Sequence, residues 1–219
     1  MINLFLGYEK RESEGFHVFV SSVLENASEL VRIVPLASVG MPQGSNAFTA
    51  SRFLVPFLMG FQGRAIFMDA SDMLLTGDVA DLDRLFDPAR AVQVVKHPNY
   101  QTRHPIKYRG TEMETVNTSY PRKNWASVML FNCSHPAWRE VTPDRLLGWK
   151  PIEMLQFHGL KDEEIGSLPD EWNRLVDEGH NTVGAKVMHW TAGIPAFPAY
   201  SSAPGAELWR QYRERMTNG

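Results

Sequence analysis

Short apolar runs alternate with segments of helical periodicity along the chain, and this alternation most strongly constrains the fold. The runs Ile2–Tyr8, Val31–Leu36 and Arg64–Met68 predict strands that are buried on both faces. Between the first two runs, apolar residues recur every three to five positions over Glu12–Ala27, as expected of a helix packed on a sheet. This repeated order of strand, helix and strand implies right-handed crossover connections between parallel strands. The sequence therefore predicts the α/β fold class, with a mostly parallel central sheet flanked by helices.

The same alternation continues to the end of the chain with one interruption. Further strands are predicted at Ala91–Val95, Trp125–Asn132 and Lys186–Trp190. Further helices are predicted at Ala47–Phe61, with Pro56 as a kink or break, and at Val79–Phe86, Pro143–Gly148, Ile165–Val176 and Ala206–Met216. Between Lys96 and Lys123 the periodicity fades, and six Lys or Arg residues stand against two Glu residues. We expect a basic, loop-rich segment there.

The composition is that of one ordinary globular domain spanning residues 1–219, because 43% of the residues are hydrophobic and 21% are charged. The formal net charge of −3 gives no overall attraction to nucleic acid, so no nucleic-acid partner is expected. The single cysteine, Cys133, cannot form an internal disulfide. We interpret it as a small core residue, in agreement with a reducing compartment.

No segment has the length of a membrane span. The longest apolar stretch, Phe53–Phe61, is nine residues long and contains a proline and a glycine, whereas a transmembrane helix needs ~20 residues. The first residues also lack a basic region followed by an apolar run and a cleavage site. We therefore expect a cytoplasmic protein. Peripheral membrane association through a partner or an acceptor lipid is compatible with the sequence.

An acidic cluster, Asp69-Ala70-Ser71-Asp72, directly follows the predicted strand Arg64–Met68. Parallel sheets bind ligands outside the carboxyl ends of their strands, where Tyr8 also falls. Two carboxylates this close resist ionising together unless a cation compensates them. Mg²⁺ or Mn²⁺ accepts such oxygen ligands and can hold a diphosphate at the same time. The pattern indicates a metal site, but an acidic turn with Asp69 as a helix cap and Asp72 solvated explains it equally well.

The wider segment Phe67–Leu82 resembles the DXD region of GT-A glycosyltransferases, especially family 8 and its bacterial relatives. Three further segments resemble that family in the same order along the chain: Ser51–Pro56, Asn124–Asn132 and Lys186–Gly193. Four stretches are similar to an uncharacterised bacterial group of family-8-like transferases: Gly7-Tyr8 with Arg11-Glu12, Tyr120–Trp125, Leu168–Asn173 and His189–Pro195. The resemblance runs from Tyr8 to about Tyr200 and implies a GT-A, Rossmann-like fold and transfer from a nucleotide sugar.

The resemblance implies that Asp69, Asp72 and His189 bind a divalent metal, Mn²⁺ or Mg²⁺. The usual motif is Asp-x-Asp, and the extra residue here leaves open whether Ser71 or Asp72 faces the metal. The late turn also lacks the lysine with which many family 8 enzymes hold the donor diphosphate. The sequence leaves Lys186, Lys123 or another basic residue as the candidate that takes the place of this lysine.

The remaining predicted roles concern the donor. Tyr8 is expected to stack on the nucleotide base, and Arg52 to reach the aspartates or a phosphate. The full set of predicted donor-binding residues is Tyr8, Arg11, Arg52, Asp69, Ser71, Lys123, Asn124, Ser127 and Gly193. Asp162 and Glu163 are predicted to be catalytic, because they lie near the position of the family's Asp-Gln pair and a carboxylate there could stabilise charge at the anomeric carbon. The basic segment, with Arg103, His104, Lys107, Arg109, Arg122 and Lys123, is expected either to cover the donor phosphates or to remain a solvated loop.

These features predict a metal-dependent glycosyltransferase that uses a nucleotide sugar, with UDP-sugars as the first choice, and a glycan or other hydroxyl acceptor. Family 8 membership would imply a retaining reaction. A nucleotidyltransferase is disfavoured because Gly7-Tyr8-Glu9-Lys10 is not a glycine-rich phosphate loop. A haloacid dehalogenase phosphatase is disfavoured because its Asp-x-Asp-x-Thr motif is absent at Asp69. A non-catalytic module that binds a sugar nucleotide or a glycan remains the alternative from another class.

Overall fold

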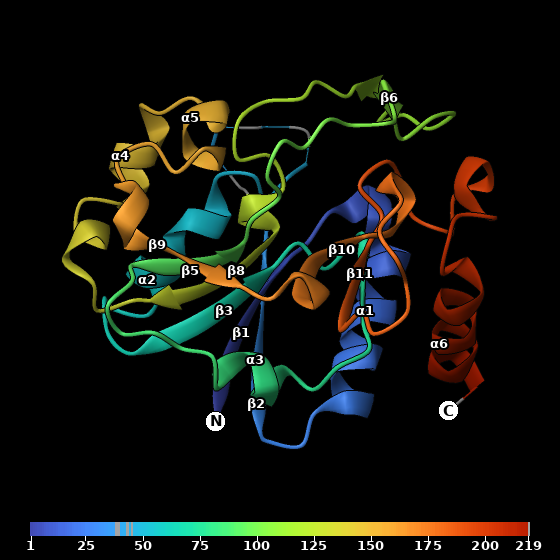
Figure 1. Cartoon of the computed structure of the whole chain (residues 1–219), viewed down its shortest axis with the longest axis horizontal. Helices are drawn as coiled ribbons and strands as arrows, with labels where there is room; N and C mark the ends of the chain where they lie inside the picture. The colour runs from blue at the N-terminus through green and yellow to red at the C-terminus, as the bar shows by residue number, and fades with distance from the viewer. Residues whose placement is uncertain (38–39, 43, 45, 219) are drawn as a thin grey trace.

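A computed structural model describes residues 1–37, 40–42, 44 and 46–218 of the chain, and it has a six-stranded central sheet (Figure 1). In spatial order the strands are β2 (Val31–Leu36), β1 (Ile2–Gly7), β3 (Arg64–Met68), β8 (Val128–Asn132), β5 (Val92–Val95) and β9 (Ile165–Leu168). Strand β8 is antiparallel to β3 and β5, whereas β1 runs parallel to β2 and β3, and β5 runs parallel to β9. The α/β class with a mostly parallel sheet is confirmed.

Helices cover both faces of this sheet because side chains alternate along its strands. Leu4 and Leu6 of β1 point to one face, where they share a core with Phe19 of α1 (Ser13–Asn26) and with α3 (Val79–Asp83). Phe5 points to the other face. The helices on that side are α2 (Val55–Leu58), α4 (Pro143–Leu147) and α5 (Pro151–Leu155). Leu24, one of the recurring apolar residues over Glu12–Ala27 that predicted this helix, is 67% exposed and therefore does not belong to its packed face.

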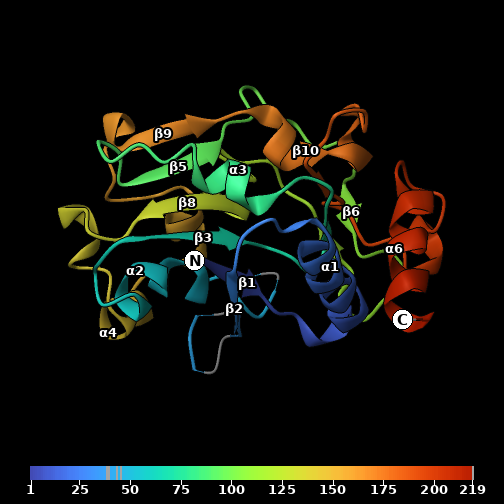
Figure 2. The same cartoon turned by 90° about the horizontal axis from the view of Figure 1, so that it is seen from below.

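A second, smaller sheet lies beside the first and was not predicted. It consists of β10 (Arg174–Leu175), β11 (Val187–His189) and β4 (Met73–Leu75), with β11 antiparallel to β4. The C-terminal helix α6 (Ala206–Asn218) packs beside α1 (Figure 2), with Trp209 and Tyr212 in a third core. The helix predicted over Ala206–Met216 is thereby confirmed.

Two predicted helices differ from the structure for local reasons. The segment predicted as helical over Ile165–Val176 instead forms β9, a 3-10 turn at Asp170–Asn173 and β10. Pro169 explains the change, because a residue before proline is disfavoured in the helical region. The helix predicted over Ala47–Phe61 is a 3-10 turn at Ser51–Leu54 followed by α2, with Pro56 in the first turn, where its missing N–H costs nothing.

Over the segment 96–123 the structure is mostly loop, as predicted, with one short hairpin. Strands β6 (Ile106–Lys107) and β7 (Thr115–Val116) pair antiparallel and lie above the carboxyl ends of the central strands (Figure 1). In the part of the chain that the structure describes, no helix is both long and apolar enough to cross a membrane.

Candidate metal and donor pocket

The acidic cluster forms a tight turn at the end of β3. Ala70 has a left-handed φ of 61°, and the Ser71 N–H donates to the Asp69 carbonyl at 2.7 Å. The Ser71 hydroxyl donates to the Gly7 carbonyl at 3.3 Å and accepts from the Glu9 N–H at 3.2 Å, so it fastens the turn to the end of β1. Ser71 is therefore turned away from the pocket, and Asp72 is the second carboxylate that faces it together with Asp69.

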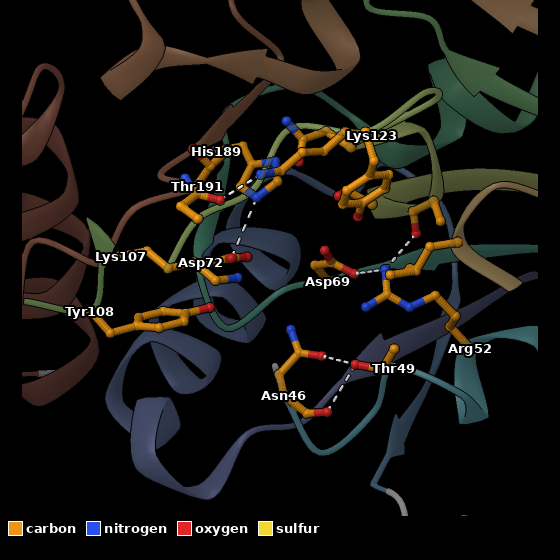
Figure 3. Close-up of a pocket in the computed structure, with 16 residues that line it drawn as sticks. Asn46, Thr49, Arg52, Asp69, Asp72, Lys107, Tyr108, Lys123, His189 and Thr191 are labelled. Atoms are coloured by element: carbon orange, nitrogen blue, oxygen red, sulfur yellow. Dashed lines mark hydrogen bonds and ion pairs between the residues drawn. The ribbon is translucent and has the colours of Figure 1, made fainter. Parts of the chain in front are cut away.

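His189 reaches the same place from the small sheet. It ends β11 opposite Met73 of β4, and the following Trp190 N–H donates to the Asp72 carbonyl at 2.9 Å. Its Nε2 lies 3.4 Å from Asp72 Oδ2 (Figure 3). Asp69, Asp72 and His189 are 6%, 5% and 2% exposed. They offer ligand atoms that all lie within 4.8 Å of one another. The predicted trio is thus assembled at the carboxyl ends of β1 and β3.

Arg52 neutralises part of this charge from the 3-10 turn Ser51–Leu54. Its Nη1 lies 2.7 Å from Asp69 Oδ1 and donates to the Ala126 carbonyl at 2.9 Å (Figure 3). The guanidinium carbon is 5.0 Å and 5.3 Å from the ring centroids of Phe48 and Phe67. Packing on aromatic rings suits a planar, weakly hydrated cation, and a lysine would not reproduce it.

Burial and neighbouring charges set the protonation of the trio. Burial raises the pKa of Asp69 to about 6, although Arg52 opposes it. Burial also acts to raise the pKa of Asp72, but His189, Lys107 and a backbone hydrogen bond together hold that pKa below its usual value. Burial acts to lower the pKa of His189, but the carboxylates of Asp72, Asp69 and Asp177 together raise it above its usual value. Without a metal, Asp72 and His189 therefore form an ion pair.

The trio opens into a polar cavity of about 70 Å³. Lys107 of β6 lines it, and burial lowers the pKa of this ammonium group. Lys123 also lines it and donates to the Thr118 carbonyl at 2.7 Å, and burial lowers its pKa to about 8. Asn124, at a left-handed φ of 65°, and Ser127 complete the predicted residues on the wall. The buried Nδ2 of Asn124 has no hydrogen-bond partner among the described residues.

The residues present fit a divalent cation. Asp72 Oδ1 is buried and accepts no hydrogen bond from any residue that the structure describes. Such an acceptor is costly unless a ligand satisfies it. Two carboxylates suit Mg²⁺ and Mn²⁺, and an added imidazole favours Mn²⁺.

Other predicted donor residues are held elsewhere. Tyr8 is half-buried and packs edge-on against Phe16, with ring centroids 5.1 Å apart. Arg11 is paired with Glu9 at 2.7 Å. Gly193 lies against the Tyr200 ring, where a Cβ would come within 2.5 Å of the ring. The structure thus gives the side chains of Tyr8 and Arg11 local partners, and it gives Gly193 a packing role.

Asp162 and Glu163, predicted as catalytic, are also not brought into the cavity. They lie exposed on a 3-10 turn at Asp162–Glu164 before β9, and Asp162 pairs with Arg122. Both residues lie away from the cavity because the segment that follows them forms β9, the edge strand of the central sheet beyond β5. The sequence had predicted a helix there.

Several lining residues were not among the predicted site residues: Asn46, Thr49, Tyr108, Asn117, Tyr120 and Thr191. Tyr120 and Thr191 lie in stretches that resemble the bacterial transferases, and Tyr108 and Asn117 lie in the basic, aperiodic segment Lys96–Lys123. Asn46 and Thr49 carried no signal in the sequence.

The parallel sheet, with its buried acidic cluster beyond the strand ends, is the fold of GT-A glycosyltransferases. The galactosyltransferase LgtC, solved with donor and acceptor sugar analogues, superposes with a TM-score of 0.65 at 12% identity over 100% of this chain and 97% of that chain. The glycosyltransferase GlyE of Streptococcus pneumoniae gives 0.64 at 14% identity over 100% of this chain and 63% of that chain.

Comparison of the amino-acid sequence identifies the family to which the chain belongs. It is 35% identical to Protein CDI of Arabidopsis thaliana over 224 residues, which cover 94% of this chain and 83% of that protein. The chain therefore belongs to the same family as Protein CDI. No protein-family model matches it.

Proposed function

We propose that this protein is a metal-dependent glycosyltransferase, with residues 1–219 acting as one GT-A domain. It transfers a sugar from a nucleotide-sugar donor, a UDP-sugar first, to the hydroxyl of a glycan or other acceptor. The observation that carries the proposal is the buried cluster of Asp69, Asp72 and His189 beyond the ends of β1 and β3. A location in the cytoplasm and a retaining, family-8-like reaction belong to the same proposal, supported by the free Cys133 and by the sequence resemblance.

Each charged or metal-ligating residue of the lining has a role in this proposal. Asp69, Asp72 and His189 would hold Mn²⁺ or Mg²⁺, which neutralises the diphosphate as it leaves. Arg52 keeps Asp69 ionised and oriented through their 2.7 Å contact. Lys107 and Lys123 bind phosphate oxygens, in place of the lysine missing from the late turn.

The sugar half of the pocket is formed by the turn before β8. The Nδ2 of Asn124 is an unused buried donor, and Ser127 lines the same wall. Hydrogen bonds from these groups to sugar hydroxyls would orient the anomeric carbon toward the acceptor. The bond from that carbon to the diphosphate oxygen breaks, and the acceptor oxygen forms the new bond.

The cavity of about 70 Å³ is smaller than the few hundred Å³ typical of ligand pockets. Tyr120 and Lys123 also line an adjoining cavity of about 370 Å³. We propose that the nucleotide-sugar donor occupies both cavities and displaces the loop that lies between the two cavities. The hairpin β6–β7 and its flanking loops are the segment that moves, because Lys107, Tyr108 and Asn117 form the opposite wall.

The decisive test is donor hydrolysis and binding across UDP-, GDP- and CMP-sugars, with Mn²⁺ or with a chelator, for the wild type and Asp72→Ala. Manganese-dependent release of nucleoside diphosphate, lost in the variant, supports the transferase and identifies the donor. Metal-dependent binding without turnover supports a non-catalytic sugar-nucleotide module. Absence of metal-dependent binding to every donor overturns the metal site.

A further inference from the structure

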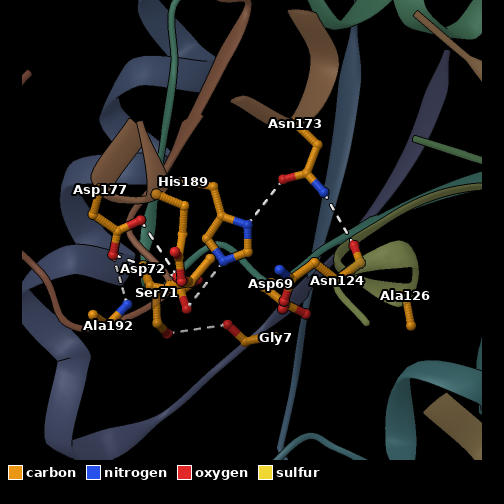
Figure 4. A network of polar contacts seen from close by, with 12 residues as sticks. Gly7, Asp69, Ser71, Asp72, Asn124, Ala126, Asn173, Asp177, His189 and Ala192 are labelled. Atoms are coloured by element: carbon orange, nitrogen blue, oxygen red, sulfur yellow. Dashed lines mark hydrogen bonds and ion pairs between the residues drawn. The ribbon is translucent and has the colours of Figure 1, made fainter. Parts of the chain in front are cut away.

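Asn173 is a fully buried polar residue at the junction of the two sheets. It ends the 3-10 turn Asp170–Asn173 that joins β9 of the central sheet to β10 of the small sheet, and its exposed fraction is 0%. Figure 4 shows its amide between His189 and the backbone of Asn124. The stretch Leu168–Asn173, which resembles a motif of the bacterial transferases, thus ends inside the site without touching the cavity wall.

The orientation of the Asn173 amide is fixed by its neighbours. Its Nδ2 lies 3.1 Å from the Asn124 carbonyl oxygen, which can only accept a hydrogen bond. The second hydrogen of the same group faces Nε2 of His97 at 3.3 Å. Burial lowers the pKa of His97 to about 3, so this imidazole is neutral and able to accept. With both hydrogens used, Oδ1 must be the atom that faces His189.

That oxygen determines which nitrogen of His189 carries the proton. Oδ1 of Asn173 lies 2.9 Å from His189 Nδ1 and can only accept, so Nδ1 must donate. In the neutral imidazole, Nε2 is then the atom with the lone pair. Nε2 is also the atom that points to Asp72. A second hydrogen-bonding partner of this kind commonly sets the tautomer and orientation of a metal-ligating histidine.

We propose that Asn173 is a positioning residue that holds His189 in its Nδ1–H tautomer and presents Nε2 to the divalent cation. The same amide, through Asn124, ties the metal-binding half of the pocket to the sugar-binding half. This inference rests on the proposed function for the identity of the ligand. In the metal-free protein the tautomer is observable at alkaline pH, where the imidazolium of the ion pair with Asp72 has lost one proton.

The test uses the full chain as wild type, Asn173→Leu and Asn132→Leu. Asn132 is the matched control, because its Nδ2 also donates to a backbone carbonyl, that of Pro88 at 3.0 Å, outside the pocket. The first readout is the ¹⁵N spectrum of His189 in metal-free protein at alkaline pH, where the imidazole is neutral, assigned with His189→Gln. The second is Mn²⁺ affinity, followed by the EPR signal of the free ion.

We expect the wild type and Asn132→Leu to show protonated Nδ1, and Asn173→Leu to show a mixture of tautomers. We also expect Asn173→Leu to bind Mn²⁺ ~10–100-fold more weakly than both, the range for losing an outer-shell partner. A wild-type His189 with its proton on Nε2, or a tautomer unchanged in a folded Asn173→Leu, overturns the inference. If the wild type binds no Mn²⁺, the proposed function fails, while the ¹⁵N spectra still decide the role of Asn173.

Discussion

Oδ2 of Asp72 and Nε2 of His189 lie 3.4 Å apart in a buried ion pair that joins the turn after β3 to the end of β11. Removing one member of a buried pair leaves the other uncompensated. The pair also supplies two of the three metal ligands in the proposed site.

We therefore expect Asp72→Asn to weaken Mn²⁺ binding by more than the ~10–100-fold that follows loss of an outer-shell partner. Donor hydrolysis should fall in parallel. Calorimetric titration with Mn²⁺ measures the first effect, and Asp144→Asn, on an exposed side chain of α4, is the control. A folded Asp72→Asn variant that binds Mn²⁺ as tightly as the wild type would contradict the assignment of Asp72 as a metal ligand.

Replacing Arg52 by methionine should destabilise the metal-free protein at neutral and alkaline pH. Its partner Asp69 would remain as a buried, unpaired carboxylate, which typically costs ~3–5 kcal/mol. Because the pKa of Asp69 is about 6, the carboxyl is largely protonated near pH ~5, and the loss should be smaller there. Urea unfolding at the two pH values checks this. An equal loss at both would mean that packing on Phe48 and Phe67, and not charge, dominates.

In the proposed site, Asp69 should also make metal affinity depend on pH. Its pKa is raised in the fold, mainly by burial, from 3.8 to about 6. The protonated carboxyl therefore stabilises the metal-free fold fully below pH ~4, and this contribution is lost as the pH rises through about 6. A metal needs the carboxylate, so affinity should increase as the pH rises through this range.

We expect Mn²⁺ affinity to fall about tenfold per pH unit below pH ~6 on account of Asp69, and the raised pKa of His189 adds a loss in the same direction. Titrations at several pH values measure this. In the metal-free protein, Asp69→Asn should abolish the decline in unfolding free energy between pH ~4 and ~6. A decline that persists in this variant would assign it to another group.

Lys107→Met should separate donor binding from metal binding. The ammonium group lies on the cavity wall, where Asp72 is one of the charges acting on its pKa. Losing a hydrogen bond to a charged phosphate costs ~1.5–3 kcal/mol, which is roughly a 10–100-fold loss of affinity for the UDP moiety with manganese. Mn²⁺ alone should bind no more weakly, because a neighbouring positive charge has been removed. Lys150→Met, on an exposed residue, is the control.

Asp162→Ala and Glu163→Ala should leave turnover within about twofold of wild type, because both residues are exposed outside the cavity. Initial rates with the donor that the hydrolysis assay identifies measure this. A large fall in kcat in either variant would restore the catalytic role expected from the sequence and require this turn to approach the pocket during the reaction.

The strand ends that hold the site were predictable because their signals are local. Buried strands such as β1 and β3 are recognisable as apolar runs, and the acidic cluster directly follows one of them. His189 could be added only through the family resemblance, since nothing local says that β11 pairs with β4 beside Asp72.

The rest of the site depends on contacts between distant segments. Lys107 and Asn117 lie in an aperiodic loop whose position is set by what it packs on. The left-handed Ala70, which lets Asp69 and Asp72 face one pocket despite the extra residue, is not a residue type that favours this conformation. Ile165 and Leu168 have helical spacing but complete the edge of the sheet beside β5.

The guanidinium of Arg52 also decides when the metal can be acquired. Because the guanidinium already compensates the charge of Asp69, and His189 compensates that of Asp72, we expect the chain to fold before it binds an ion. Folding and metal loading are then separate events, unlike in small zinc domains that unfold without their ion. If the proposed site takes manganese, a cell short of manganese would accumulate folded but inactive protein that can still bind the ion.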